Sequence, residues 1–191
     1  MTPHAALWKK IKFVTGNPNK AREAGQILGI EVERVDLPGL FEIQTSDLSE
    51  LMTHKVNQAY EVLKTPVMVE DSALIFAAWN GLPGALVKWF EKSVGCAGMV
   101  KMLEPFGNRE AFAVCQVAVR QGEEIIVARG EVKGSIAHAP RGGNGFGWDV
   151  IFIPDGQTHT FAEMSAEEKN AISHRRKAFE ALRSMLQSGR V

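Results

Sequence analysis

The sequence predicts an α/β fold built around a mixed β-sheet, and two patterns carry that prediction. Over the first third of the chain, short apolar runs alternate with amphipathic segments, which is typical of parallel strands joined by helices. Residues 111–120 and 124–131 then alternate at period two on either side of Gln121-Gly122-Glu123, which indicates an antiparallel hairpin. A chain with both kinds of pairing is expected to form a mixed sheet.

The predicted strands are short apolar or alternating runs bounded by turn residues. Along the chain they are expected at residues 11–15, 32–35, 67–69, 111–120, 124–131, 134–138 and 150–153. The run at 67–69 leads directly into Glu70-Asp71, so these carboxylates are expected at the end of a buried strand. Four glycines between Pro140 and Gly147 predict a flexible or closely approaching loop before the last strand.

The predicted helices carry end signals as well as apolar periodicity. They are expected at residues 20–28, 47–63, 85–91, 93–104 and 173–187. Gly29 is placed to end the first helix, and Asp47-x-x-Glu50 resembles a capping box at the start of the second. Ser173 is a suitable N-cap for the last helix.

Composition and charge exclude several classes of protein. The 191 residues favour one domain, expected to span residues 1–191 with its core at about 10–187. Lys+Arg and Asp+Glu are both 22, so no net charge draws the chain to nucleic acid or to an anionic membrane. No apolar run reaches membrane-spanning length, and residues 1–10 lack the apolar region of a signal peptide. We therefore expect a cytoplasmic protein without nucleic-acid or membrane partners, in which Cys96 and Cys115 are small buried hydrophobic residues.

The segment between the first predicted strand and helix is a candidate phosphate site. It places a hydroxyl, an amide and an ammonium at a helix start, where free backbone N–H groups attract anions. The candidate phosphate-binding residues are Thr15, Gly16, Asn17, Pro18, Asn19 and Lys20. The segment lacks the glycine pair of a Walker A loop, so a plain turn that uses Gly and Asn is the alternative interpretation.

Three further groups could carry chemistry. Adjacent buried carboxylates at Glu70-Asp71 are costly unless they are paired or bind a metal, although solvated acids are the alternative. The aromatic side chains of Gly145-Phe146-Gly147-Trp148-Asp149 suit a purine ring, although core packing would explain them equally well. His174 and Arg175 fall in the first turn of the last helix, where the helix dipole disfavours cations, so this placement hints at function rather than at a merely solvated basic start.

The order of these motifs along the chain resembles that of the inosine triphosphate pyrophosphatase family, and the resemblance covers about residues 10–186. The matching blocks are Thr15-Gly16-Asn17-x-x-Lys20, Val69-Glu70-Asp71-Ser72, Gly81-Leu82-Pro83-Gly84 with Lys88-Trp89-Phe90, Gly145-Phe146-Gly147-Trp148-Asp149, Phe161-Ala162-Glu163-Met164 and Glu168-Lys169-Asn170-x-x-Ser173-His174-Arg175. The resemblance implies an elongated mixed sheet flanked by helices, two lobes around a central cleft, and a homodimer. It also implies that inosine, deoxyinosine and xanthosine triphosphates are hydrolysed to the monophosphate and pyrophosphate, with Mg²⁺ or, as a substitute, Mn²⁺. Such enzymes remove these nucleotides from the pool.

The resemblance further implies roles for individual residues. Asp71 activates the attacking water and shares the metal with Glu42, Glu70 is a further metal candidate, and Lys20 offsets phosphate charge. Beyond the Thr15–Lys20 segment, the implied substrate-binding positions are Lys55, Ser72, Lys88, Phe146, Gly147, Trp148, Asp149, Lys169, His174 and Arg175. Lys169, His174 and Arg175 would donate hydrogen bonds to a 6-oxo group and leave the adenine amino group unpaired.

One departure and two alternatives accompany this interpretation. Gly39-Leu40-Phe41 precedes Glu42 as an insertion relative to the usual loop of the family, which bears on the Glu42 assignment. A Maf-type nucleotide pyrophosphatase is one alternative, against which Ser173-His174-Arg175 argues. A nucleotide-binding sensor without turnover is the other, and the presence of Lys20 and Asp71 argues against it.

Overall fold

A computed structural model describes residues 10–188 of the chain and places their strands in a mixed seven-stranded sheet, as predicted. The order across the sheet is β2 (Glu33–Val35), β1 (Lys12–Val14), β3 (Val67–Phe76), β5 (Glu110–Gln121), β6 (Glu124–Ile136) and β7 (Phe152–Pro154), and β4 (Pro83–Gly84) pairs with β3. β1 runs parallel to β2 and β3, whereas the other pairs are antiparallel. Residues 1–9, which make up most of the segment considered for a signal peptide, and residues 189–191 lie outside the described residues.

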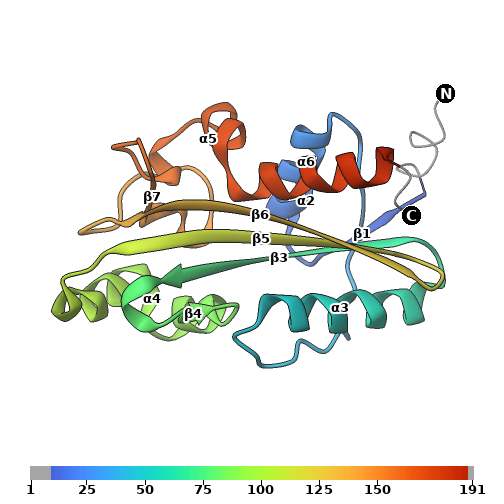
Figure 1. Cartoon of the computed structure of the whole chain (residues 1–191), viewed down its shortest axis with the longest axis horizontal. Coiled ribbons are helices and arrows are strands. Elements are labelled where there is room, and N and C mark those ends of the chain that lie inside the picture. The colour runs from blue at the N-terminus through green and yellow to red at the C-terminus, as the bar shows by residue number, and fades with distance from the viewer. Residues whose placement is uncertain (1–9, 189–191) are drawn as a thin grey trace.

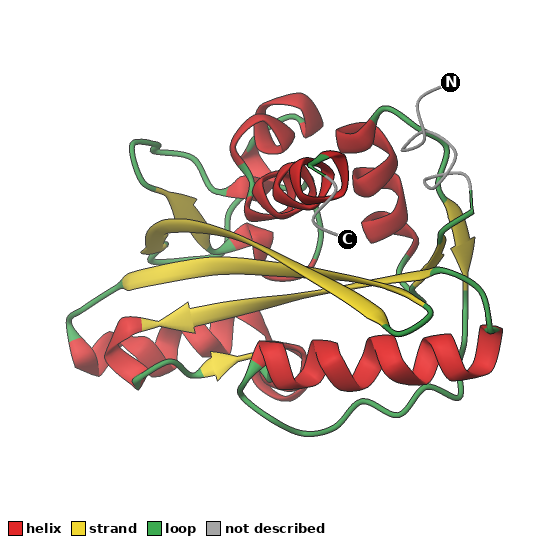
Figure 2. Ribbon diagram, turned by 45° about the vertical axis from the view of Figure 1, so that its right-hand side comes forward, coloured by secondary structure: helices red, strands yellow, loops and turns green. Residues whose placement is uncertain are grey.

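Helices cover both faces of the sheet (Figure 1). α2 (Pro18–Leu28), α5 (Ala166–Ile172) and α6 (His174–Gln187) lie on one face, whereas α3 (Leu48–Leu63) and α4 (Val87–Leu103) lie on the other. Short 3-10 turns connect these elements, at η1 (Ala77–Trp79), η2 (Glu104–Phe106), η3 (Gly147–Val150) and η4 (Phe161–Glu163). The longest strands run along the long axis of the molecule, which gives the elongated sheet of the prediction (Figures 1 and 2). None of the helices within residues 10–188 combines the length and apolar character that a membrane span needs.

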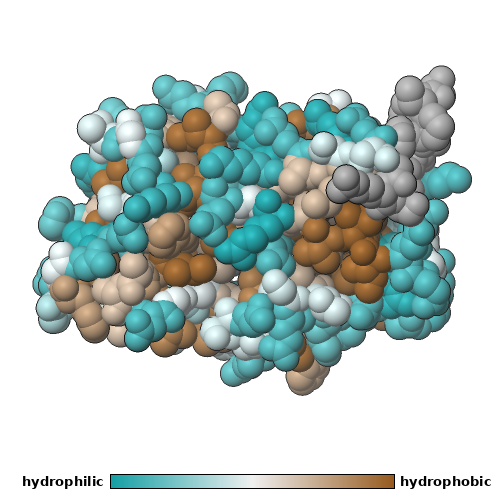
Figure 3. All heavy atoms as spheres, in the orientation of Figure 1, coloured by the Kyte–Doolittle hydropathy of each residue, from teal (hydrophilic) through white to brown (hydrophobic). Residues whose placement is uncertain are grey.

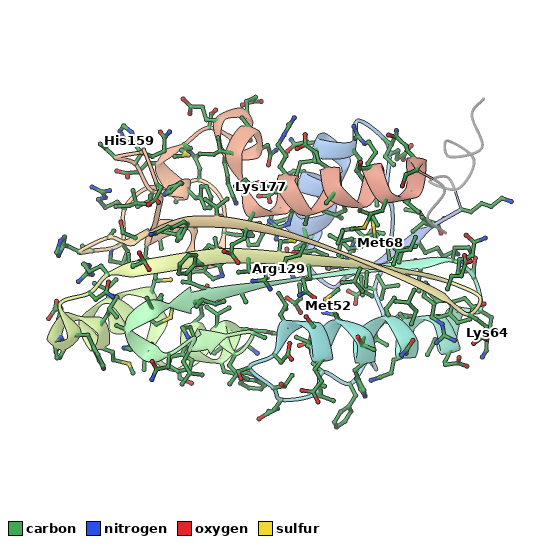
Figure 4. All side chains as sticks on the ribbon, in the orientation of Figure 1. Met52, Lys64, Met68, Arg129, His159 and Lys177 are labelled. Carbon is green, nitrogen blue, oxygen red and sulfur yellow. The ribbon has the colours of Figure 1, made fainter. Side chains whose placement is uncertain are left out.

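The core has an apolar layer on each face of the sheet. Met68 of β3 packs in the layer formed with α2 and α6, and Met52 of α3 packs with Val69 in the opposite layer. Figure 4 shows Met68 above the sheet and Met52 below it. Successive side chains of a strand point to opposite faces. The alternation therefore sends Glu70 to the α6 side with Met68, and Asp71 to the α3 side with Val69.

The helix ends follow the sequence signals. Asn17, Asp47 and Ser173 each accept a hydrogen bond from a backbone N–H of the first helical turn, and Gly29 ends α2 with a φ of 67°. The two helices expected at 85–104 are joined into α4, with non-helical backbone at Gly95. α5 was not predicted, although a capping box at its start gave the signal.

β3 extends beyond the three residues predicted for it. It continues to Phe76 because β5 pairs with it over its whole length, from Val67 opposite Arg120 to Phe76 opposite Ala111. The prediction that Glu70-Asp71 ends a strand is therefore wrong, and both residues lie within β3. They still lie beside the end of β1, since Phe13 of that strand is in register with Met68.

β6 and β7 also differ from their predicted bounds. β6 runs without the break expected after residue 131, and the last strand starts two residues late because residues 147–150 form η3. Two glycines within β6, Gly130 and Gly134, allow close packing. A Cβ on Gly130 would lie 2.1 Å from the carbonyl oxygen of His174, and one on Gly134 would lie 2.2 Å from that of Ile153.

Candidate active site

Two cavities meet at the middle of β3. The first has a volume of about 990 Å³ and lies between the segment after β1, the loop at 36–44 and the start of α4. The second, of about 310 Å³, lies between β3, α4, the η3 segment and the start of α6. They share the residues Asn17, Lys20, Asp71 and Lys88. An elongated molecule with two different ends could therefore lie across Lys20 and Asp71.

Of the predicted phosphate segment, Thr15, Gly16, Asn17 and Lys20 line the first cavity, whereas Pro18 and Asn19 line neither cavity. Thr15 Oγ1 accepts a hydrogen bond from the Asn17 N–H at 3.1 Å, and Asn17 Oδ1 accepts one from the Asn19 N–H at 2.9 Å. Pro18 has no N–H and begins α2. Two of the N–H groups expected to bind phosphate are thus already occupied within the loop.

Lys20 and Lys55 hold the carboxylate of Asp71 between them. Lys20 Nζ lies 2.8 Å from Asp71 Oδ1, and Lys55 Nζ lies 3.0 Å from Asp71 Oδ2. Burial acts to raise the pKa of Asp71, but the two ammonium groups outweigh it and hold that pKa well below its usual range. Burial likewise acts to lower the pKa of each lysine, and the nearby carboxylates reverse the effect, so both lysines stay charged.

Glu42 reaches the same cavity despite the longer loop that precedes it. Lys55 Nζ donates to Glu42 Oε1 at 3.0 Å, and Lys88 Nζ donates to Glu42 Oε2 at 3.1 Å. The backbone of Phe41 is fixed by two hydrogen bonds to the side chain of Gln58 on α3, which positions the loop. The inserted residues therefore leave Glu42 beside Lys55 in the first cavity.

Glu70 is buried on the other face of the sheet. Its carboxylate accepts from Arg175 Nη2 at 3.0 Å, Ser72 Oγ at 2.8 Å and Cys115 Sγ at 3.2 Å, and lies 3.2 Å from Lys20 Nζ. Burial raises the pKa of Glu70, but Arg175 and Lys20 outweigh it and bring the pKa to about 2. Glu70 lines neither cavity, so this carboxylate anchors cations rather than facing a ligand.

A second buried carboxylate, Glu23 of α2, was not predicted from the sequence. Glu23 Oε1 accepts from Lys169 Nζ at 2.9 Å, and Glu23 Oε2 accepts from Arg175 Nη1. Lys169 Nζ also donates to Asp149 Oδ2 at 2.6 Å, and the same oxygen accepts from the Phe146 N–H at 2.8 Å. Lys169 is therefore engaged with two carboxylates and does not line the second cavity.

Ten charged side chains form one alternating series through the site. In order they are Asp149, Lys169, Glu23, Arg175, Glu70, Lys20, Asp71, Lys55, Glu42 and Lys88. Each member pairs with its neighbours, and the five acids balance the five bases. Glu70, Arg175, Glu23, Lys169 and Asp149 are almost fully buried, so removal of one of these five would leave a buried charge without its partner, which is strongly destabilising.

The second cavity is walled by aromatic side chains. The Phe146 ring lies 5.0 Å from Lys169 Nζ and 5.4 Å from Arg175 Cζ, so two cations face it. Trp148 is buried in the apolar core and packs on the His174 ring at a centroid distance of 5.2 Å. Burial, followed by the charges of Arg175 and Lys169, holds the pKa of His174 well below 6.5, so His174 is neutral. Phe146 is thus the freer aromatic surface, and Trp148 supports the wall.

Comparison with known proteins decides the family. A sequence model described as the Ham1 family matches residues 11–185. The chain belongs to the Ham1 family. Among Ham1 family structures, it is similar to a HAM1 protein from Coxiella burnetii, with a TM-score of 0.79, 28% identity and coverage of 94% of this chain and 98% of that one.

Relatives of this Ham1 family member also match over nearly their whole length. The chain is 44% identical to a protein named inosine triphosphate pyrophosphatase from Batrachochytrium dendrobatidis, over 94% of this chain and 95% of that one. It is 45% identical to a dITP/XTP pyrophosphatase from Methanopyrus kandleri, over 90% of this chain and 93% of that one. These matches confirm the resemblance found in the sequence.

Proposed function

We propose that this protein hydrolyses inosine, deoxyinosine and xanthosine triphosphates to the nucleoside monophosphate and pyrophosphate, and so removes non-canonical purine nucleotides. The observation that carries the proposal is the pair of cavities that meet at Lys20 and Asp71. One cavity is lined by three lysines together with carboxylates, and the other by an aromatic ring with hydrogen-bond donors. The names of its Ham1 family relatives support the same activity.

The two cavities suggest how the nucleotide lies. The base would occupy the second cavity against Phe146, and the phosphates would extend into the first cavity toward Lys55 and Lys88. The bond between the α and β phosphates would then fall near Lys20 and Asp71. Cleavage there releases pyrophosphate on the side of the larger cavity.

The residues of the chain can support attack by water. Asp71 is ionised, so its carboxylate can accept the proton of the attacking water in a general-base role. Lys20 and Lys55 face the cavity from either side of Asp71, and phosphate oxygens would compete for their ammonium groups. Binding of the triphosphate would thus free the carboxylate and place positive charge beside the phosphates, where negative charge develops.

Glu42 and Asp71 are the residues proposed to hold Mg²⁺, with Mn²⁺ as a substitute. Carboxylate oxygens from both residues converge on the ammonium of Lys55. Although residues 10–188 contain no group of three or more potential ligands, Mg²⁺ commonly uses one or two carboxylates together with phosphate and water. The donor set therefore fits. When bound, the metal would offset the charge of the phosphates and orient them.

Base selection is proposed to depend on Arg175 and His174. Arg175 lines the second cavity and can offer a donor to a 6-oxo group, whereas the amino group of adenine would leave that donor unpaired. The predicted direct role of Lys169 is revised. Its ammonium is held by Glu23 and Asp149, so we propose that it positions Asp149 and Phe146 instead.

A homodimer in the cytoplasm is part of the same proposal. Figure 3 shows apolar surface at the end of the molecule that carries α4 and again on the right-hand side. The exposed apolar side chains of α4 and the adjoining turns support a protein partner. They include Leu82, Trp89, Val94, Met102 and Phe106. Sedimentation at micromolar concentration should give twice the mass of 21.0 kDa, and a monomer would contradict the dimer.

The activity is tested by pyrophosphate release from inosine, deoxyinosine, xanthosine, guanosine, adenosine and thymidine triphosphates, with and without Mg²⁺. Fast, metal-dependent release from the first three alone is expected. Release from pyrimidine nucleotides would instead favour a Maf-type enzyme. Saturable binding of inosine triphosphate without release would identify a sensor.

A further inference from the structure

The carboxylate of Glu91 faces the second cavity from α4. Glu91 is partly buried, and a Cβ placed on Gly147 would lie 2.9 Å from its Oε1. The carboxylate is thus set against the backbone of the segment that carries Phe146 and Trp148. Glu91 is not among the site residues predicted from the sequence.

Glu91 is not a member of the series of ten paired charged side chains. The other charged residues that line the second cavity, Lys20, Asp71, Lys88, Asp149 and Arg175, belong to the neutral series of ten. Within the described part of the chain, no cation within salt-bridge distance pairs with Glu91. Burial, and then the negative charge of Asp149, raise its pKa, and the positive charge of Lys20 opposes them only in part. A carboxylate without an ion-pair partner among the described residues therefore faces this cavity.

We infer that Glu91 is a specificity-determining residue that favours a neutral purine with a ring N–H and disfavours an anionic base. The inference rests on the proposed function and ranks its substrates. Hypoxanthine is neutral and presents an N1–H, which a carboxylate can accept. Adenine has no such hydrogen. Xanthine loses a ring proton near neutral pH, so its anion would be repelled.

The test compares inosine and xanthosine triphosphates at pH 8 with wild type, Glu91→Gln and Glu91→Leu. Glu91→Gln should raise the xanthosine-to-inosine ratio of kcat/KM about five- to tenfold, because the repulsion is removed while an acceptor oxygen remains. Glu91→Leu should raise the ratio further, because the acceptor for the inosine N1–H is lost as well. Glu104→Gln, which removes an exposed carboxylate outside both cavities, is the matched control and should leave the ratio unchanged.

A second measurement separates this inference from the proposed function. Calorimetry gives the affinities of inosine and xanthosine monophosphates for the same variants, without any need for turnover. A wild-type protein that binds the monophosphates but releases no pyrophosphate would overturn the proposed function, and the affinity ratio would still test Glu91. Ratios within twofold of wild type for both Glu91 variants would overturn the inference.

Discussion

Glu70 and Asp71 are consecutive in β3, yet their carboxylates bind different helices on opposite faces of the sheet. Glu70 accepts from Arg175 of α6, and Asp71 accepts from Lys55 of α3. Lys20 contacts both, because α2 begins where β1 ends beside them. This arrangement places Lys20 and Asp71 where the two cavities meet.

Asp71→Asn should reduce turnover of inosine triphosphate by at least about 100-fold, because the acceptor for the proton of water is lost. Triphosphate binding should be retained, since Lys20 and Lys55 remain to contact phosphates. Pyrophosphate release and calorimetric binding measure the two effects separately. Rates like those of wild type would remove Asp71 as the base.

Arg175→Ala should reduce discrimination against adenosine triphosphate, because the donor proposed for the 6-oxo group is lost. The ratio of kcat/KM for inosine and adenosine triphosphates measures this effect. Arg175→Lys keeps the charge but lacks the planar guanidinium, so its kcat/KM ratio should lie between those of wild type and Arg175→Ala. If the ratio were unchanged in both variants, Arg175 would have no part in base selection.

Arg175→Ala should also destabilise the fold. The guanidinium is buried between Glu23 and Glu70, so both carboxylates would lose their partner. Breaking a buried pair costs about 3–5 kcal/mol, which lowers the melting temperature by at least about 6 °C for a chain of this length. Thermal unfolding checks this, and a melting temperature within about 2 °C of wild type would show that the pairs contribute little.

His174 should make stability fall in mild acid. Its pKa is held well below 6.5 in the folded state, so only the unfolded state takes up this proton just below pH 6.5. Stability therefore decreases as the pH falls from 6.5, by at most about 1.4 kcal/mol per pH unit. His174→Phe keeps a ring against Trp148 and Phe161 but cannot titrate. Between pH 6.5 and 5, the free energy of unfolding measured with urea should fall less for His174→Phe than for wild type. Equal decreases would contradict this account.

Gly130→Ala should push α6 away from β6. The added methyl group would lie 2.1 Å from the His174 carbonyl oxygen and 2.3 Å from the Ala178 nitrogen, both of which are backbone atoms. We expect a cost of at least about 2 kcal/mol and a melting temperature roughly 4–8 °C lower. Gly143→Ala, which meets no atom within 4 Å, is the control. Similar melting curves for the two variants would argue against close packing at Gly130.

Local signals predicted the helices better than the strand ends. The caps at Asn17, Asp47 and Ser173 depend on residues within one helical turn, so the sequence displays them directly. The end of β3 depends instead on pairing with β5, which lies some forty residues along the chain. No pattern near Glu70 indicates that partner.

The sequence predicted the basic residues of the candidate site but missed some of its acidic residues. Lys20, Asp71, Lys55 and Glu42 lie together as the family resemblance indicated. Glu23 and Glu91 were missed. Glu23 lies three positions after Lys20 on α2, and Glu91 lies three positions after Lys88 on α4, so helical spacing places each on the same face as a lysine of the site. That spacing was a usable signal.

The most direct test identifies the products of inosine triphosphate hydrolysis by phosphorus NMR, alongside adenosine triphosphate at equal concentration. The meeting of the two cavities at Lys20 and Asp71 predicts inosine monophosphate and pyrophosphate, with little reaction of adenosine triphosphate. Formation of inosine diphosphate and inorganic phosphate would contradict the proposed position of the cleaved bond. Equal hydrolysis of the two nucleotides would contradict the account of base selection.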